Sequence, residues 1–201
     1  EPHLLKWQSY LLPLYERKQA GEELTAEENK RLERLGYSYY LLALSRKEKG
    51  EPDEAFALMD MAIARSLRAD EQIRYTAIKG QMLNEEKRYD AAIELWNGLI
   101  ERVPDYAAAY ALRQEAAFYG RNAGLVIEDF WNVVDMIPDY PKAYVYAAKV
   151  YNIYERSDLF DEMLQVAERN GINSMALSLE HAKKLKREKD YTAAKEIFQK
   201  L

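Results

Sequence analysis

Apolar residues along most of this chain recur every three or four positions, the spacing that places them on one face of an α-helix. The stretch from Tyr89 to Leu99 is the clearest example, with Ala92 and Trp96 between them at helical intervals. Polar segments such as residues 84–88 separate one apolar run from the next. The pattern predicts an all-α protein made of short helices joined by polar turns.

A seven-residue phrase occurs twice, as PDYAAAY at residues 104–110 and as PDYPKAY at residues 138–144. Five of the seven positions match, at a separation of 34 residues. A fixed period of this length is typical of a solenoid in which each unit is one pair of helices. In both copies we expect the proline to end one helix and the aspartate to cap the next.

Counting in steps of 34 residues from Ile73 divides the chain into similar units, with residues 70–72 as an insertion. The predicted units are 36–69, 73–106, 107–140, 141–174 and a truncated 175–201. The last unit stops at Leu201 inside its second helix, which suggests that the natural protein continues.

Residues 1–35 lack this frame and are expected to form an N-terminal helical cap or a degenerate repeat. Within them, Thr25 and Glu28 fit a capping box, in which each side chain accepts the other residue's backbone N–H. The helix that starts there is predicted to run from Ala26 to Lys49, because Gly50 follows as a stop signal.

These units resemble the tetratricopeptide repeat (TPR), a 34-residue helix–turn–helix unit that places small residues where its two helices touch. In this chain the small position of the first helix is Ala43, Gly80, Ala148 and Ala182, but Gln114 in the third unit. The large position of the second helix is Met59, Trp96, Phe130, Leu164 and Phe198. Small residues at a helix crossing allow close approach, and a bulky residue opposite fills the remaining gap.

The resemblance implies a right-handed α-solenoid of about five repeats behind the N-terminal cap. Four aromatic residues at repeat positions are expected in its core: Tyr89, Trp96, Tyr151 and Tyr191.

In TPR arrays the second, fifth, ninth, twelfth and thirteenth positions of the first helix line a concave groove that binds peptides or partner helices. Carried over by position, the aromatic groove residues are Tyr37, Tyr40, Phe118 and Tyr119. The polar groove residues are Arg74, Gln81, Asn84, Lys142, Lys149, Asn152, Lys183, Lys186 and Arg187. Chaperone-binding members carry a Lys/Asn carboxylate clamp here, but Tyr40 and Leu44 replace its opening residues, so we do not expect that activity.

The charge is unevenly distributed along the chain. Residues 181–201 hold seven Lys or Arg against three Asp or Glu, whereas residues 36–180 hold 16 against 24. A basic stripe in the groove would favour acidic or carboxylate-terminated peptides, and the alternative is a solvated helix face. The net charge of −5 argues against general nucleic-acid binding.

The sequence offers little for catalysis. It has no cysteine, its two histidines, His3 and His181, lie far apart, and it lacks a glycine-rich phosphate loop after a strand. We therefore predict no catalytic residue, no metal site and no cofactor, and the protein is not expected to be an enzyme. The lack of cysteine and of an apolar run of about 20 residues favours a soluble, cytoplasmic protein without membrane insertion.

The functional expectation is a protein–protein interaction module, part of a larger protein, that binds a peptide or partner helix in its concave groove. One alternative is a structural scaffold that forms homo-oligomers through its array ends or convex face. Another is an auxiliary domain of an enzyme or chaperone cofactor.

Overall fold

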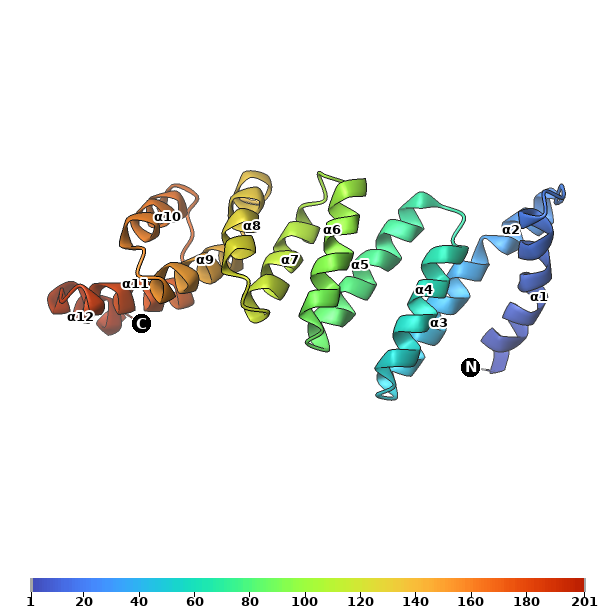
Figure 1. The fold of residues 1–201 in the computed structure, drawn as a ribbon, viewed down its shortest axis with the longest axis horizontal. Helices are drawn as coiled ribbons and strands as arrows, with labels where there is room; N and C mark the ends of the chain where they lie inside the picture. The colour runs from blue at the N-terminus through green and yellow to red at the C-terminus, as the bar shows by residue number, and fades with distance from the viewer. Residues whose placement is uncertain (1, 201) are drawn as a thin grey trace. The chain divides into compact units, whose positions relative to one another are not determined.

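The computed structural model describes residues 2–200, and these form helices and turns with no strand (Figure 1). The helices are α1 (Pro2–Gln19), α2 (Ala26–Leu32), α3 (Arg34–Glu48), α4 (Pro52–Arg65), α5 (Ala69–Glu85), α6 (Tyr89–Arg102), α7 (Ala107–Tyr119), α8 (Ala123–Met136), α9 (Pro141–Ile153), α10 (Ser157–Arg169), α11 (Met175–Arg187) and α12 (Tyr191–Lys200). The prediction of an all-α fold of paired helices is confirmed. Leu201, where the last predicted helix was expected to continue, lies outside the described residues. The chain divides into two compact units, residues 1–86 and 87–201.

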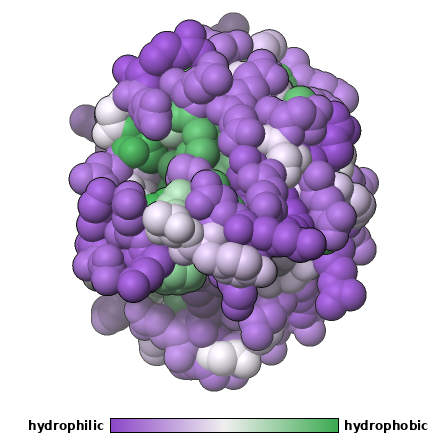
Figure 2. All heavy atoms as spheres, turned by 90° about the vertical axis from the view of Figure 1, so that its left-hand side faces the viewer, coloured by the Kyte–Doolittle hydropathy of each residue, from purple (hydrophilic) through white to green (hydrophobic). Residues whose placement is uncertain are grey.

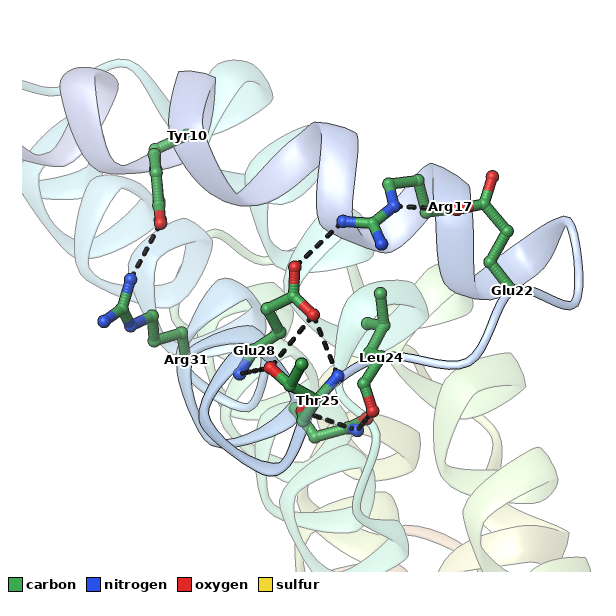
Figure 3. Close-up of polar contacts among 8 residues, drawn as sticks. Tyr10, Arg17, Glu22, Leu24, Thr25, Glu28 and Arg31 are labelled. Carbon is green, nitrogen blue, oxygen red and sulfur yellow. Dashed lines mark hydrogen bonds and ion pairs between the residues drawn. The ribbon is translucent and has the colours of Figure 1, made fainter.

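In the first unit, α1 packs against α2 and α3, and α4 packs against α3 and α5. The predicted capping box is present at the start of α2. Glu28 N–H donates to Thr25 Oγ1 at 3.2 Å, and Thr25 N–H donates to Glu28 Oε2 at 2.8 Å (Figure 3). Arg17 of α1 holds the other carboxylate oxygen of Glu28 at 2.9 Å. The bond from the Thr25 backbone and the Arg17 guanidinium lower the pKa of Glu28.

The single helix predicted from Ala26 to Lys49 is wrong at Glu33, where α2 ends and α3 begins. The start of α3 lies against the end of α4, so closely that a Cβ on Gly36 would be 2.2 Å from the Ser66 hydroxyl oxygen. Both α2 and α3 pack against α1 as well. Glu33 between them has φ of −53° and ψ of −23°, so the helix is interrupted only locally and the backbone keeps a right-handed helical conformation.

In the second unit, α7/α8, α9/α10 and α11/α12 form successive helix pairs, and α6 packs against α7. The core includes Phe130, Tyr144, Phe160 and Met163, all fully buried. Of the predicted large residues, Met59, Trp96 and Phe130 are fully buried, and Leu164 is partly buried.

The prediction that Tyr191 is a core residue is wrong, since this side chain is 62% exposed, and Phe198 is 47% exposed. Both lie on α12, whose main packing partner among the described helices is α11. Tyr151, in the middle of the unit, is buried as predicted, and Tyr89 is partly buried. A large residue at one of these repeat positions is therefore buried only where a further helix packs over it.

The turn inside each helix pair has the same backbone conformation in every repeat. Four non-glycine residues have positive φ angles near 60°, each 34 residues from the next: Lys87, Arg121, Glu155 and Lys189. The equivalent residue of the first pair is Gly50, with φ of 75°. After this residue the chain closes a bond back into the helix, as when Asn122 N–H donates to Ala117 O at 2.8 Å. This is the Schellman arrangement that satisfies the last carbonyls of a helix.

The repeated PDY phrase forms the same contact twice. The Tyr110 hydroxyl donates to the Pro104 carbonyl at 3.1 Å, and the Tyr144 hydroxyl donates to the Pro138 carbonyl at 2.8 Å. Neither aspartate caps the following helix as predicted, because the cap residue is the tyrosine after it, with no side-chain bond. Backbone carbonyls take that role, and Ala109 N–H donates to Tyr106 O at 2.8 Å.

Gln114 occupies the position that is small in the other repeats, and it is fully buried. Its amide nitrogen donates to the Val126 carbonyl at 3.1 Å and to the Ala143 carbonyl at 3.3 Å. The side chain thus joins α7 to α8 and to the start of α9. This bonding satisfies the buried amide nitrogen of Gln114, whereas the amide oxygen has no hydrogen-bond partner among the described residues.

The left-handed turn residues give a test of the repeat geometry. Glycine adopts this conformation without the steric cost that a side chain meets, so Arg121→Gly and Glu155→Gly should each raise the free energy of unfolding by about 0.5–1 kcal/mol. Urea unfolding followed by circular dichroism would measure the change. The control is Glu162→Gly, at an exposed position inside α10, which should lower stability by about 1 kcal/mol. If all three variants lowered the free energy of unfolding by the same amount, the left-handed conformation of the turn residues would be contradicted.

Candidate binding surface

The first helices of three repeats lie side by side in the second unit. α9 packs against α7 on one side and against α11 on the other. Residues at equivalent positions of these helices therefore gather on one surface, which we call the α7/α9/α11 surface. It contains eight of the predicted groove residues: Phe118, Tyr119, Lys142, Lys149, Asn152, Lys183, Lys186 and Arg187.

Aromatic rings cluster at the α7 end of this surface. The Phe118 ring stacks on Tyr146 of α9 with centroids 4.8 Å apart, and Lys149 Nζ lies 5.3 Å from the Phe118 centroid. Tyr119 stacks on Tyr89 of α6 at 5.7 Å and remains 51% exposed. Burial raises the pKa of Tyr146. The cluster thus presents aromatic area next to a lysine, an arrangement that favours cation–π contact.

A shallow hollow of about 490 Å³ opens beside these rings, between the end of α7 and the end of α9. Its lining includes Phe118 and Tyr119 together with Ile153 and Tyr154, which are 71% and 61% exposed. The hollow is mostly apolar in its side chains, so it suits an aliphatic or aromatic group of a ligand.

At the α11 end, polar groups join neighbouring helices. Glu180 is buried, and the Asn152 amide donates to its carbonyl at 2.9 Å and to its carboxylate at 3.0 Å. Arg187 donates to the Asn152 carbonyl at 2.9 Å and to the Ser157 hydroxyl at 3.3 Å. Asn152 and Arg187 therefore hold α9 against α11.

The lysines of the surface are more available than Asn152 and Arg187. Lys183 forms an ion pair with Glu180 at 2.7 Å but its side chain is 54% exposed. Lys142 lies 3.7 Å from Glu115 with a side chain 62% exposed, and Lys186 is exposed. Exposed ammonium groups act on a ligand mainly through long-range attraction.

The other predicted groove residues lie in the first unit. Tyr37 and Tyr40 of α3 are 5.9 Å apart by ring centroid, and Tyr40 stacks on the buried Tyr75 of α5 at 5.1 Å. The Arg74 guanidinium lies 5.0 Å from the Tyr75 centroid. Of the remaining two predicted residues in α5, Gln81 is exposed and Asn84 is partly buried.

Sequence reasoning missed the buried partners of these residues, namely Tyr75, Tyr146 and Glu180. Each of these residues lies at a position where the helical periodicity predicts burial. A polar or aromatic residue at such a position was the feature of the sequence that could have identified them. Which groove residue each one contacts depends on the packing of separate helices.

A buried ion pair lies inside the second unit. Arg113 of α7 forms two bonds with the fully buried Asp129 of α8, at 2.6 and 3.0 Å, and donates to Asn97 of α6 at 2.6 Å. Burial raises the pKa of Asp129 from 3.8 to about 6, while Arg113 acts in the opposite direction. Shifted carboxyl groups mark candidate functional sites, but this one is enclosed and joins three helices. We assign it a structural role.

Among residues 2–200, no group of three or more His, Asp or Glu side chains is arranged to hold a metal ion. His181 is half-buried, and burial lowers its pKa. No helix in the described part of the chain is long and apolar enough to span a membrane.

No protein-family model matches the sequence, and no curated protein matches it. Solved structures do match. MamA from Desulfovibrio magneticus RS-1, residue 41 to the end, is 17% identical, with a TM-score of 0.70 over 82% of this chain and 92% of that one. Pseudomonas aeruginosa PilF is 15% identical, with a TM-score of 0.63 over 99% of this chain and 92% of that one. A thermophilic TPR protein of Thermus thermophilus is 16% identical, with a TM-score of 0.52 over 82% of this chain and 89% of that one.

These likenesses, together with the repeated helix pairs, define the fold. The chain has a TPR-like fold of the α-solenoid class.

The Asp129 carboxyl gives a pH test of the buried pair. Because its folded-state pKa is raised to about 6, its contribution to stability is complete below about pH 4 and is lost as the pH rises through 6. The free energy of unfolding, minus that of Asp129→Asn, should therefore fall by roughly 2 kcal/mol between about pH 4 and pH 7.5. Urea titrations across this range measure the difference.

The control for this measurement is Asp135→Asn, at an exposed position of the same helix. The difference in unfolding free energy between the parent and Asp135→Asn should change by less than half as much over the same pH range. A flat curve for Asp129→Asn would mean that Arg113 keeps the carboxylate ionised throughout.

Proposed function

We propose that this protein is a non-catalytic protein-interaction module that binds an acidic peptide or partner helix on the α7/α9/α11 surface. The observation that carries the proposal is the combination of exposed lysines with an exposed aromatic cluster on three adjacent helices. Its exposed lysines are Lys142, Lys183 and Lys186, the partly buried Lys149 lies against Phe118, and the exposed aromatic anchors are Tyr119 and Tyr154.

The two kinds of residue are suited to different steps of binding. Tyrosine supplies a large contact area with few rotamers to immobilise, and it favours a slow dissociation rate. Lysine ammonium groups attract an acidic ligand over about 8–10 Å at moderate salt and so favour fast association. Asn152 and Arg187, which are engaged in bonds between α9 and α11, keep the lysine-bearing helices in register.

The test separates these contributions. Lys149→Gln/Lys183→Gln should slow association with an acidic, carboxylate-terminated peptide about 3–10-fold at low salt and less at high salt. Tyr119→Ala should mainly raise the dissociation rate, by roughly 5–30-fold, because it removes about 1–2 kcal/mol of contact. Stopped-flow fluorescence with a labelled peptide measures both rates.

The matched control is Lys195→Gln, on the exposed face of α12 and outside this surface. It should leave both rates unchanged. If the lysine and tyrosine variants of the α7/α9/α11 surface bind the peptide normally and Lys195→Gln does not, the binding site lies on another face of the protein.

A second candidate function is self-association through the outer face of α11 and α12. Apolar side chains there are exposed, with Met175 at 68%, Leu179 at 37% and Phe198 at 47%. Viewed from this end of the second unit, an apolar patch interrupts a mostly hydrophilic surface (Figure 2). Exposed apolar patches of this kind often mark interfaces between proteins.

This candidate predicts a concentration-dependent mass. Light scattering across a dilution series should show species above the 23.5 kDa monomer that dissociate on dilution, and Phe198→Ser should abolish them. Ile153→Ser is the control, because that residue is 71% exposed but lies in the hollow at the end of α9. A constant mass of 23.5 kDa at all concentrations would leave the interaction surface as the better account.

A further inference from the structure

A second hollow lies outside the repeats, in the N-terminal cap. It has a volume of about 580 Å³ and is walled by α1 on one side and by α2 with the start of α3 on the other. The α1 wall is formed by His3, Lys6, Trp7, Tyr10 and Leu11. The opposite wall is formed by Glu27, Lys30, Arg31 and Arg34. On both walls the residues recur at intervals of three and four, so each helix presents one face to the hollow.

The hollow is strongly basic. Among the described residues that line it, four are Lys or Arg and one, Glu27, carries a carboxylate. That carboxylate is already occupied, since Arg31 Nε donates to it at 2.9 Å. The same guanidinium donates to the Tyr10 hydroxyl at 2.8 Å (Figure 3). Lys6 and Lys30 form no ion pair with any carboxylate among residues 2–200. Positive charge on both walls therefore remains without a counter-ion among residues 2–200.

The hollow also exposes aromatic surface. Trp7 is 46% exposed and Tyr10 is 56% exposed, whereas Leu11 between the helices is 2% exposed. The Arg34 guanidinium lies 5.5 Å from the centroid of the Trp7 ring, which holds the indole at the rim. Large aromatic groups next to unpaired cations provide both contact area and charge for one ligand.

We propose that this hollow is a second binding site, for a short acidic segment of a partner protein that places an aliphatic or aromatic side chain against Trp7 and Tyr10. The carboxylates of the segment pair with Lys6, Lys30 and Arg34. A small anion alone would leave the exposed indole unused. A nucleic acid would meet a protein of net charge −5, with acidic residues at Glu22, Glu23 and Glu28 close by in the sequence.

This site is separate from the α7/α9/α11 surface, and neither proposal depends on the other. Its volume lies within the range of about 300–1,000 Å³ that accommodates a few side chains of a ligand.

The test uses a fluorescent acidic peptide of about 12 residues that carries one Leu and one Phe, and it measures fluorescence anisotropy with the full chain. Lys6→Gln/Lys30→Gln/Arg34→Gln should weaken binding at least about 10-fold and flatten its dependence on salt. Trp7→Ala should weaken binding about 5-fold or more while leaving the salt dependence intact. A second peptide carries Ser in place of both Leu and Phe. Its affinity for the unchanged protein should be as low as the affinity of the original peptide for Trp7→Ala.

The comparison variant is Lys142→Gln/Lys149→Gln/Lys186→Gln, which neutralises the α7/α9/α11 surface instead. If only this variant loses the peptide, the proposed function stands and the N-terminal site is wrong. If only the N-terminal variants lose it, the N-terminal site stands alone. Circular dichroism of each variant verifies folding, and the Trp7 indole N–H resonance of the parent should shift on peptide addition.

Competition decides the class of ligand. Inorganic phosphate at millimolar concentration should not displace the peptide, and a single-stranded RNA oligonucleotide of equal charge should bind more weakly. Displacement by phosphate, or tighter binding of the RNA, would overturn the proposal of an acidic protein segment.

Discussion

Each helix pair in residues 87–201 depends on its neighbour to cover apolar surface that it cannot cover alone. Phe130 of α8 meets Tyr144 of α9 with ring centroids 5.3 Å apart, and both side chains are fully buried. Phe160 of the next pair is fully buried in the same core. Where this succession ends, the same repeat position on α12 leaves Phe198 half exposed. Burial of apolar area stabilises each helix pair by about 25 cal/mol per Å². The stability of each pair therefore depends on its stacking against the neighbouring pair.

Stacking also determines what is left for recognition. Because the second helices and the inner faces of the first helices are used for the core, the outer faces of α7, α9 and α11 carry the lysines and exposed rings together. Polar bonds between helices then hold these faces in a fixed register. Gln114 joins α7 to α9, and the Asn152–Glu180 pair joins α9 to α11. A buried polar group that lost its partner would cost about 1–3 kcal/mol, so these bonds favour one arrangement over slipped alternatives.

The N-terminal cap combines buried apolar residues with polar contacts at its surface. Leu11, Leu14, Leu32 and Leu35 are buried, and Arg17 of α1 forms an ion pair with Glu28 of α2. Exposed ion pairs contribute little stability, typically below about 1 kcal/mol. Trp7 and Tyr10 of the cap remain 46% and 56% exposed, which is similar to the exposure of Tyr119 and Tyr154 in the repeats.

The sequence by itself determined the helical repeat, its period, the helix pairs and the burial of Met59, Trp96 and Phe130, because periodicity and small-residue positions are local properties. It also identified the Thr25–Glu28 capping box, which spans only one helical turn. It could not show that Gln114 bonds to two helices, that Asn152 and Arg187 join α9 to α11, that Tyr191 is exposed, or that α1 and α2 enclose a basic hollow. Those features depend on side chains from separate helices that meet only when the pairs stack, and their distances follow from packing rather than from spacing along the chain.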